Sequence, residues 1–308
     1  MESATRTTLH TVARLHYESD LSQIEIARRL GTSPATVSRL LRRAREEGVV
    51  RIEISALTSP DELTRELIDA LGLRSAFLVP TSEIGLLASL SAPAGILLKE
   101  AGLSEGSVLA IGWGRAVRET VNAGLPYFPG ITVVPATGGM QEGAAHFQIN
   151  EFVRLAAEQT GGAPQFLHAP YLPSRELHEA FLADPTMRDR VALWDRIDAA
   201  VVGIGLPHGI DPVHANAATA SEKALSKAAG DVIRHYFDAD GNLLPWDGDE
   251  RLIAVSPSQL RRIPLVIGLA ASPKKAHAIV GAVRAGLVNA LVTDVATAEA
   301  VLLATIKG

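Results

Sequence analysis

Short polar side chains and arginines follow Ser33-Pro34 near the N-terminus. Ser33 is suited to cap a helix, and Pro34 to occupy its first position. Small side chains at the front of a helix fit the major groove of DNA, where Arg39 can donate to guanine, and arginines further along can meet phosphates. The residues expected to contact DNA are Ser33, Ala35, Thr36, Ser38, Arg39, Arg42 and Arg43.

A second predicted helix lies just ahead of this one. Ser22 and Glu25 form a capping box, and Gly31 stands where a short turn needs a positive φ. A plain helical hairpin with a solvated basic face is the alternative, but residues 28–45 hold six arginines and no acid, which favours a helix-turn-helix. The apolar stripe expected to hold the hairpin together is Ile24, Ala27 and Leu30.

Four loops follow predicted strands in the rest of the chain: three contain glycines, at 111–115, 135–139 and 203–205, and the fourth, at 271–275, contains a serine and two lysines. Ligands of open α/β sheets bind beyond the carboxyl ends of the strands, so these loops together predict a site for an anionic small molecule, such as a sugar phosphate. Each loop alone is a weak signal, since glycine is common at such turns. The residues expected there are Gly112, Trp113, Gly114, Arg115, Thr137, Gly138, Gly139, Asp238 and Lys274.

Two of these residues carry particular expectations. Ser272 is expected to cap a helix whose first turn holds Lys274, so that an anion meets both the helix N-terminus and the lysine. A Schiff base at Lys274 is the alternative that needs more special conditions. Asp238 and Asp240 are expected to read hydroxyl groups, or else to close a turn in the segment YFDADGN.

Other chemistry finds less support. His208, Asp211 and His214 could bind a metal, but they lie in a segment broken by proline and glycine, and no metal or cofactor is expected. There is no Walker A pattern, no clean dinucleotide-binding fingerprint and no catalytic residue that spacing identifies. The chain has no cysteine, which excludes disulfides, thiol catalysis and zinc–thiolate sites.

Composition and charge indicate a two-part globular protein. The 308 residues carry a net charge of −5, yet residues 1–56 hold nine arginines against seven acids, and the remainder 20 basic against 27 acidic residues. A nucleic acid would therefore be contacted by the N-terminal part. No apolar run reaches the ~18 residues that span a bilayer, and the N-terminus has no apolar core like that of a signal peptide, so a cytoplasmic protein is expected.

The apolar pattern predicts an N-terminal domain over residues 1–57 and a larger α/β domain over 58–308. VVRIEI at 49–54 alternates like the wing strand of a winged helix. Continuous apolar runs alternating with amphipathic segments predict a mostly parallel sheet flanked by helices. The expected strands are 76–80, 108–112, 131–135, 165–169, 199–203, 264–269 and 290–293, and the expected helices 84–101, 115–123, 150–160, 174–182, 222–228, 272–285 and 296–304.

Nearly the whole chain resembles the SorC/DeoR-type sugar-binding transcriptional regulators. The resemblance implies a second domain related to sugar-phosphate isomerases that serves as an effector sensor, and dimers or tetramers that bind palindromic operators. It implies the same pocket loops and the same Asp238 and Lys274 as above. The chain departs at ASPKK, where many relatives have a glycine pair. The matching segments are LSQIEIARRLGTSPATVSRLLRRAREEGVV, IGWGRAV, VVPATGG, NEFVRLAAEQTGG, LHAP, AAVVGIG, GDVIRHYFDADGNLL, PLVIGLAASPKKAHAI and AGLVNALVTDVATAEAVL.

The sequence thus predicts a DNA-binding regulator that is not an enzyme, with double-stranded operator DNA, a small-molecule effector and further copies of itself as partners. A sugar-phosphate isomerase-like enzyme with an attached DNA-binding module is the chief alternative. No convincing acid–base pair emerges from the residues, which weighs against the enzyme. A constitutive architectural DNA-binding protein is the third alternative. It does not explain the large second domain with its glycine-containing loops.

Overall fold

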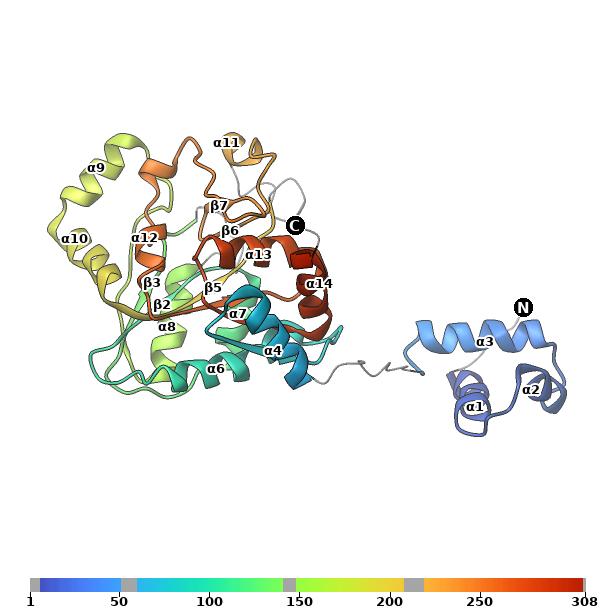
Figure 1. The fold of residues 1–308 in the computed structure, drawn as a ribbon. Coiled ribbons are helices and arrows are strands. Elements are labelled where there is room, and N and C mark those ends of the chain that lie inside the picture. The colour runs from blue at the N-terminus through green and yellow to red at the C-terminus, as the bar shows by residue number, and fades with distance from the viewer. Residues whose placement is uncertain (1–5, 51–59, 141–147, 208–218, 307–308) are drawn as a thin grey trace. The chain divides into compact units, whose positions relative to one another are not determined.

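A computed structural model describes residues 6–50, 60–140, 148–207 and 219–306. The chain divides into two compact units, Met1–Leu57 and Thr58–Gly308. Figure 1 shows the elements of each unit. The expected wing strand falls largely on 51–54, and the histidines considered as possible metal ligands on 208–218, both outside the described residues.

Over residues 6–50 the first unit contains three helices, α1 (Arg6–Tyr17), α2 (Gln23–Arg29) and α3 (Pro34–Glu46). The capping box at the start of α2 is confirmed, since Ser22 Oγ accepts from Glu25 N and Glu25 Oε2 accepts from Ser22 N. The expected apolar stripe is wrong in two of its three positions. Ile24 is 61% and Leu30 42% exposed, because α2 turns its Ile26–Ala27 face inward and ends before Leu30. The core of the unit consists of Val12, Ile26, Ala27, Val37 and Leu41.

The second unit is built on a parallel seven-stranded sheet in the order β1-β9-β8-β5-β2-β3-β4, which confirms the predicted fold class. The central strands read as continuous apolar runs because helices cover both faces. All residues of β2 and β8 are buried. The strands are β1 (Ser75–Val79), β2 (Val108–Ile111), β3 (Thr132–Pro135), β4 (Ala163–Pro164), β5 (Ile197–Gly203), β8 (Leu265–Leu269) and β9 (Ala290–Asp294).

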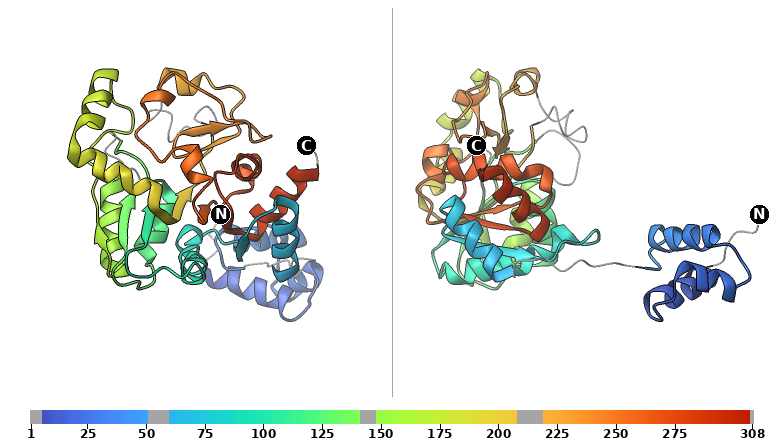
Figure 2. Two further views of the ribbon diagram at one scale, coloured as in Figure 1. Left: turned by 60° about the vertical axis from the view of Figure 1, so that its left-hand side comes forward. Right: turned by 45° about the vertical axis from the view of Figure 1, so that its right-hand side comes forward.

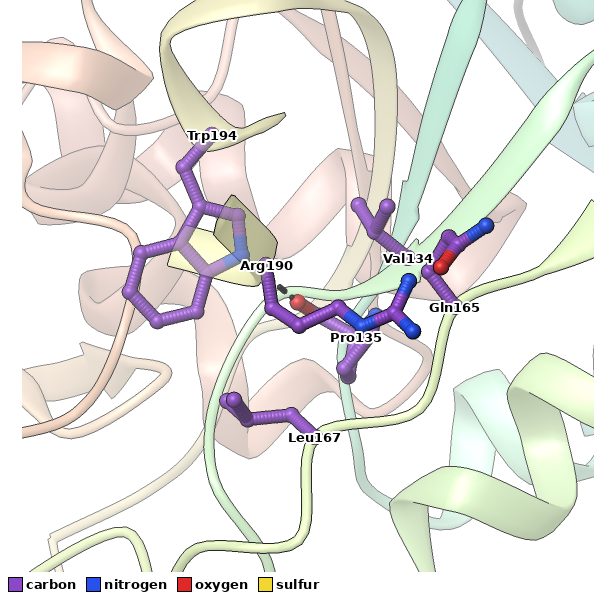
Figure 3. A pocket seen from close by; sticks show the side chains of 6 residues that line it. All are labelled: Val134, Pro135, Gln165, Leu167, Arg190 and Trp194. Atoms are coloured by element: carbon purple, nitrogen blue, oxygen red, sulfur yellow. Dashed lines mark hydrogen bonds between the residues drawn. The ribbon is translucent and has the colours of Figure 1, made fainter. Parts of the chain in front are cut away.

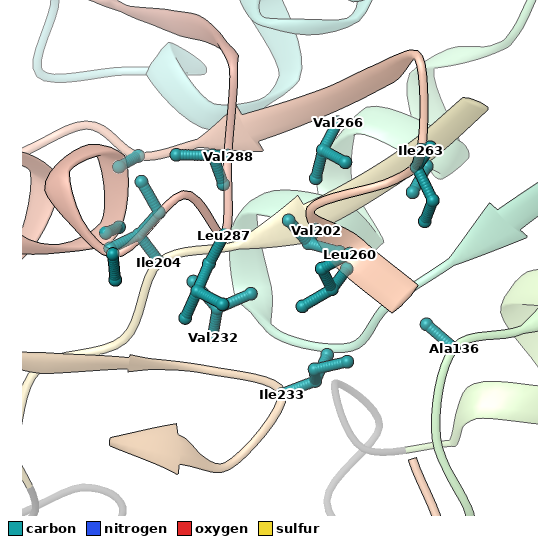
Figure 4. Packing of buried hydrophobic residues seen from close by; sticks show 14 of the residues in the cluster. Ala136, Val202, Ile204, Val232, Ile233, Leu260, Ile263, Val266, Leu287 and Val288 are labelled. Carbon is teal, nitrogen blue, oxygen red and sulfur yellow. The ribbon is translucent and has the colours of Figure 1, made fainter. Parts of the chain in front are cut away.

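Two hydrophobic cores lie on opposite faces of this sheet. Neighbouring strand residues point to opposite sides, so Leu109 and Ile111 join one core and Ala110 the other. Figure 4 shows part of the core that contains Ala110. In Figures 1 and 2, α4 and α14 lie side by side against this core. Its helices include α4 (Pro60–Leu71), α13 (Ala276–Arg284) and α14 (Val295–Ile306), and those of the other core include α6 (Ser91–Glu100), α7 (Arg115–Ala123) and α8 (Ile149–Thr160).

Several expected elements differ from the structure. The strand expected at 165–169 is wrong, because Leu167 N donates to Asn150 Oδ1 and Ala169 O accepts from Gly139 N instead of a neighbouring strand. The helix expected at 222–228 is only the single turn α11 (Ala220–Lys223), and that expected at 84–101 divides into α5 (Leu86–Ser89) and α6. The short helices α9 (Arg175–Ala183), α10 (Pro185–Ala192) and α12 (Pro257–Leu260) complete the described layers.

An antiparallel hairpin, absent from the predicted elements, follows α11. Its strands β6 (Gly230–Val232) and β7 (His235–Phe237) enclose a two-residue turn. Ile233 has φ 44° and Arg234 φ 70°, the pair of positive values that such turns need and that Asn-Gly normally supplies. Both residues are buried, so the tip of this hairpin lies inside the protein.

Candidate functional site

The exposed face of α3 holds the residues predicted to contact DNA. Ser33 caps the helix, with its Oγ accepting from Thr36 N at 3.1 Å. Val37 and Leu41 are buried in the unit's core, whereas Ala35, Arg39 and Arg42 are exposed. Positions three and four apart share a helix face, so these three exposed residues form one stripe. The arrangement is the one that a recognition helix requires.

The arginines of α3 differ in their surroundings. Arg39 Nη2 donates to Thr36 Oγ1 at 3.4 Å, a long and readily exchanged contact. Arg43 is engaged within the helix, with its Nη2 2.6 Å from Glu47 Oε1. A phosphate would therefore compete with Glu47 for Arg43, so the exposed Arg42 is better placed for a phosphate contact.

The topological switch point of the sheet lies between β2 and β5. From β2 the chain proceeds outward through β3 and β4, whereas from β5 it proceeds to the other side through β8 and β9. Open α/β sheets bind ligands at the carboxyl ends of such a strand pair. Two of the predicted loops meet there closely, because a Cβ on Gly203 would stand 3.1 Å from the Trp113 carbonyl oxygen.

The buried tip of the β6–β7 hairpin brings a cation to this region. Arg234 and Glu222 form an ion pair of 3.3 Å between Nη1 and Oε1, with side chains 2% and 0% exposed. The Arg234 guanidinium lies 5.4 Å from the ring centroid of Trp113 and 5.3 Å from that of Tyr171. Tyr236 Oη donates to Glu222 Oε1 at 2.9 Å. These five residues, named here the arginine–aromatic cluster, join the hairpin to the loops after β2 and β4.

The ionisation of this cluster follows from its burial and its charges. Burial acts to lower the pKa of Arg234, but the neighbouring Tyr236, Asp231 and Glu222 together raise it, so the guanidinium keeps its charge. Burial raises the pKa of Tyr171 to about 12, and burial also raises the pKa of Tyr236. Both tyrosines therefore carry their protons at neutral pH and can donate as well as accept hydrogen bonds.

The loop after β8 presents a different lysine from the one that the sequence indicated. Lys275 Nζ donates to the Ile204 carbonyl oxygen at 2.6 Å, in the loop after β5, whereas Lys274 is exposed. The expected cap at Ser272 is wrong. Pro273–Lys275 form a 3-10 turn with no side-chain cap, α13 begins only at Ala276, and Ser272 N donates to Thr297 Oγ1.

Several other predicted ligand contacts are engaged within the protein. Thr137 is fully buried and donates to Ile253 O, and Gly138 packs so closely that a Cβ would stand 2.7 Å from the Pro170 carbonyl oxygen. Gly139 donates to Ala169 O. The Asp238 carboxylate accepts from the backbone of Asp240 and from Asn242, which lowers its pKa, so it closes a turn.

Sequence reasoning missed Arg234, Glu222, Tyr171, Tyr236 and Lys275. Thr219 and Glu222 were recognisable as a capping box, which the structure contains, but the box does not reveal that the carboxylate also meets an arginine. No turn residue marks the hairpin tip, since Ile and Arg occupy its two positions. The missed side chains were therefore accessible only through the fold.

A small pocket lies beside these loops, at the carboxyl end of β3 (Figure 3). Its space of about 10 Å³ is that of one water molecule, too little for a sugar. Trp194 closes it, with Nε1 donating to the Pro135 carbonyl oxygen at 2.8 Å. This pocket does not serve as a sugar site. Its lining residues are Val134, Pro135, Gln165, Leu167, Arg190 and Trp194.

Among the described residues, no helix is long and apolar enough to cross a membrane, and no group of three or more His, Asp or Glu side chains could hold a metal ion.

Each of the two units matches a known protein family. Residues 55–303 match the family model described as "Putative sugar-binding domain", and residues 6–51 match "Winged helix-turn-helix DNA-binding". The chain is 32% identical to the sorbitol operon regulator of Klebsiella pneumoniae, over 94% of this chain and 96% of that protein. It is 28% identical to the deoxyribonucleoside regulator of Bacillus subtilis, over 94% and 95% of the two chains.

Solved structures show the same relationship. The crystal structure of the full-length sorbitol operon regulator SorC from K. pneumoniae superposes with a TM-score of 0.72 at 30% identity, covering 96% of this chain and 99% of that one. A probable sor operon regulator from Shigella flexneri superposes with a TM-score of 0.73 at 26% identity, covering 80% of this chain and all of that one.

Proposed function

The chain belongs to the SorC/DeoR-type family of transcriptional regulators, and from this membership we propose that its second unit senses a phosphorylated sugar and alters operator binding by its first unit. The observation that supports this most strongly is Lys275 Nζ at the Ile204 carbonyl oxygen. It brings a cation to the switch point of the sheet, where an anionic ligand of this fold would bind.

The groups around Lys275 suit a phosphate. Helix α7 begins directly after the loop 112–114, and its N-cap is Gly114, which has no side chain to occupy the first-turn N–H groups. Such a helix start attracts anions through those N–H groups and through the helix dipole. Arg115, exposed in the first turn, adds a second positive charge. The phosphate would therefore lie between the loops after β2 and β5, with Lys275 beside it.

The first unit would bind double-stranded operator DNA through α3. Ala35, Thr36, Ser38 and Arg39 would face base edges, and Ser33, Arg42 and Arg43 would meet phosphates. One such unit buries little DNA surface, so specific binding would require a homodimer or homotetramer that holds two units on a palindromic operator. A regulator of this kind would work in the cytoplasm, where the operator DNA is.

The domain would bind its ligand without turnover. The buried carboxylate Glu222 is paired with Arg234 and accepts from Tyr236 Oη, so its oxygens are engaged within the protein rather than directed at a substrate. Effector and DNA would instead be coupled by a shift between two arrangements of the oligomer. The effector would change operator affinity by a given factor, and the operator would change effector affinity by the same factor.

The test is a thermal-shift screen of the full chain against hexose, pentose and polyol phosphates. A ligand of the folded protein raises its melting temperature by mass action. Each compound that raises the melting temperature is then added to the protein–operator complex, and fluorescence anisotropy measures the operator affinity. In a separate experiment the compound is incubated with the protein without DNA, to detect any conversion to a product. We expect the sugar phosphate to bind saturably, to change the protein's affinity for the operator, and to be recovered without chemical conversion. Failure of every sugar phosphate to bind would contradict the sensor, and conversion of a hit would favour an isomerase-like enzyme.

A further inference from the structure

The Arg234–Glu222 pair of the arginine–aromatic cluster takes no part in the phosphate site just described. We propose that it reads the neutral, hydroxyl-bearing end of the effector, so that the protein selects a sugar or polyol phosphate, whose phosphate is its only anionic group, over a phosphorylated sugar acid. This inference rests on the proposed sensing of a phosphorylated sugar. It assigns specificity to Arg234 and Glu222, with Trp246 beside them.

The backbone conformation at Arg234 is one that arginine does not favour. An arginine at this position is therefore explained by the contacts of its side chain and not by the turn. A positive φ costs an L-residue other than glycine about 1–2 kcal/mol, and both Ile233 and Arg234 adopt one. Glycine would hold the same conformation without that cost. Backbone strain of this kind persists where the surroundings impose it, and it clusters at ligand sites.

Glu222 holds the cluster neutral. Its Oε2 accepts from Thr219 N at 2.7 Å, and its Oε1 from Tyr236 Oη at 2.9 Å and from Arg234. Asp231, a second carboxylate, accepts from Arg234 N at 3.1 Å. A ligand carboxylate would thus join two carboxylates around one guanidinium, an unfavourable balance at a buried site. A hydroxyl group adds no charge, and it can both donate and accept.

Trp246, which packs against the cluster, has a donor that would gain from a hydroxyl oxygen. Trp246 packs edge to face on Tyr236, with ring centroids 6.0 Å apart. Its buried Nε1 has no acceptor among the residues that the structure describes. Buried indole N–H groups normally have a partner, so this one points to an acceptor that the ligand brings.

The loop 203–205 separates the two ends of the proposed ligand. On one side Lys275 donates to Ile204 O at 2.6 Å. On the other, Gly205 N donates to Asp231 O at 2.9 Å, in the hairpin that bears Arg234. The cation Lys275 therefore lies beside Ile204, and the hairpin whose Arg234 is paired with Glu222 lies beside Gly205. This order matches a ligand with one anionic and one uncharged end.

The first experiment compares two ligands by calorimetric titration of the full chain. Sorbitol 6-phosphate and 6-phosphogluconate differ only at carbon 1, which is a CH₂OH group in one and a carboxylate in the other. We expect the polyol phosphate to bind at least about tenfold more tightly, since facing like charges is costly. Equal binding, or a preference for the acid, would overturn the inference alone. Binding of neither compound, when another sugar phosphate of the screen binds, would also overturn the inference, whereas failure of every sugar phosphate would contradict the proposed function itself.

The second experiment uses two matched substitutions. Trp246→Phe removes an indole N–H that has no described acceptor but also leaves a small cavity, so it should lower the melting temperature of the free protein less than Trp194→Phe does. Sorbitol 6-phosphate should bind roughly threefold to tenfold more weakly, the loss of one neutral hydrogen bond, while inorganic phosphate binds as before. Trp194→Phe removes an indole that donates to Pro135 O. It should lower the melting temperature and leave both affinities unchanged. Wild-type affinity for the polyol phosphate in Trp246→Phe would overturn the assignment.

Discussion

Arg234 and Glu222 form an ion pair of 3.3 Å whose two side chains are almost wholly removed from solvent. Removing one partner of a buried ion pair typically costs about 3–5 kcal/mol, although Asp231 remains beside Arg234 and compensates part of its charge. We therefore expect Glu222→Gln to lower the free energy of unfolding by an amount of this order, measured by urea denaturation of the full chain.

The double substitution Arg234→Gly with Glu222→Gln supplies the control. It removes both charges and relieves the positive φ at Arg234, so we expect it to be more stable than Glu222→Gln alone. Residues in contact show such non-additivity, whereas independent residues add within a few tenths of a kcal/mol. Strictly additive losses would show that the pair does not act as a unit.

The arginines of α3 should differ in what they contribute to DNA binding. Arg39→Ala is expected to cost about 1–3 kcal/mol on the operator and to relax specificity at one position of each half-site. Arg42→Ala should weaken binding to all sequences and reduce the salt slope by about one. Arg43→Ala should cost less, because Arg43 already pairs with Glu47 at 2.6 Å. Anisotropy on operator and random DNA across salt concentrations measures all three, and an equal loss on both DNAs for Arg39→Ala would contradict the groove assignment.

The parallel sheet could be predicted because its strands are apolar on both faces. Leu109, Ala110 and Ile111 enter two different cores, so the sequence shows a continuous run that no alternating strand would give. The same logic failed at 165–169. Leu167 and Ala169 are buried there, but their backbone groups bond to the side chain of Asn150 and to Gly139. Burial alone does not distinguish a strand from a tethered loop.

The candidate site was predictable in its loops but not in its side chains. Glycines at 112, 114, 203 and 205 marked the switch point. Lys274 and Lys275 are adjacent, and which of them faces the loop after β5 depends on a 3-10 turn that no residue type signals. Arg234 reaches the site from a hairpin whose turn lacks the usual Asn or Gly. These side chains depend on long-range packing.

Stability at high pH should report on Tyr171. Burial raises the folded-state pKa of Tyr171 to about 12, above the ordinary value near 10. Between these values the unfolded chain releases the proton while the folded protein keeps it. The contribution of Tyr171 to the free energy of unfolding is therefore complete below about pH 10 and is lost as the pH rises toward 12. Urea midpoints should fall more steeply over this interval in the wild type than in Tyr171→Phe, and parallel curves would contradict the shift.

The first unit alone should bind operator DNA weakly. A fragment of residues 1–57 keeps the core formed by α1, α2 and α3 but lacks the unit proposed to oligomerise. Linking two sites raises the apparent affinity by about 10²–10⁴-fold, so we expect a loss of at least about 10²-fold relative to the full chain. Anisotropy at fixed salt measures it, with circular dichroism to establish that the fragment is helical. Equal affinities would remove the argument for an oligomerising second unit.

Lys274 and Lys275 provide a matched pair for the phosphate site, because they are adjacent in sequence and differ in what they face. Lys275 Nζ lies on the Ile204 carbonyl oxygen at the switch point, whereas Lys274 is exposed. Lys275→Ala should weaken binding of an effector found in the thermal-shift screen by about 1.5–3 kcal/mol, as for one hydrogen bond to a charged group. Lys274→Ala should change it little. Both proteins should bind operator DNA normally in the absence of effector, since neither lysine belongs to the DNA-binding unit. Calorimetric titration decides between them: if Lys274→Ala loses affinity and Lys275→Ala keeps it, the phosphate lies on the outer side of the 3-10 turn, away from the switch point.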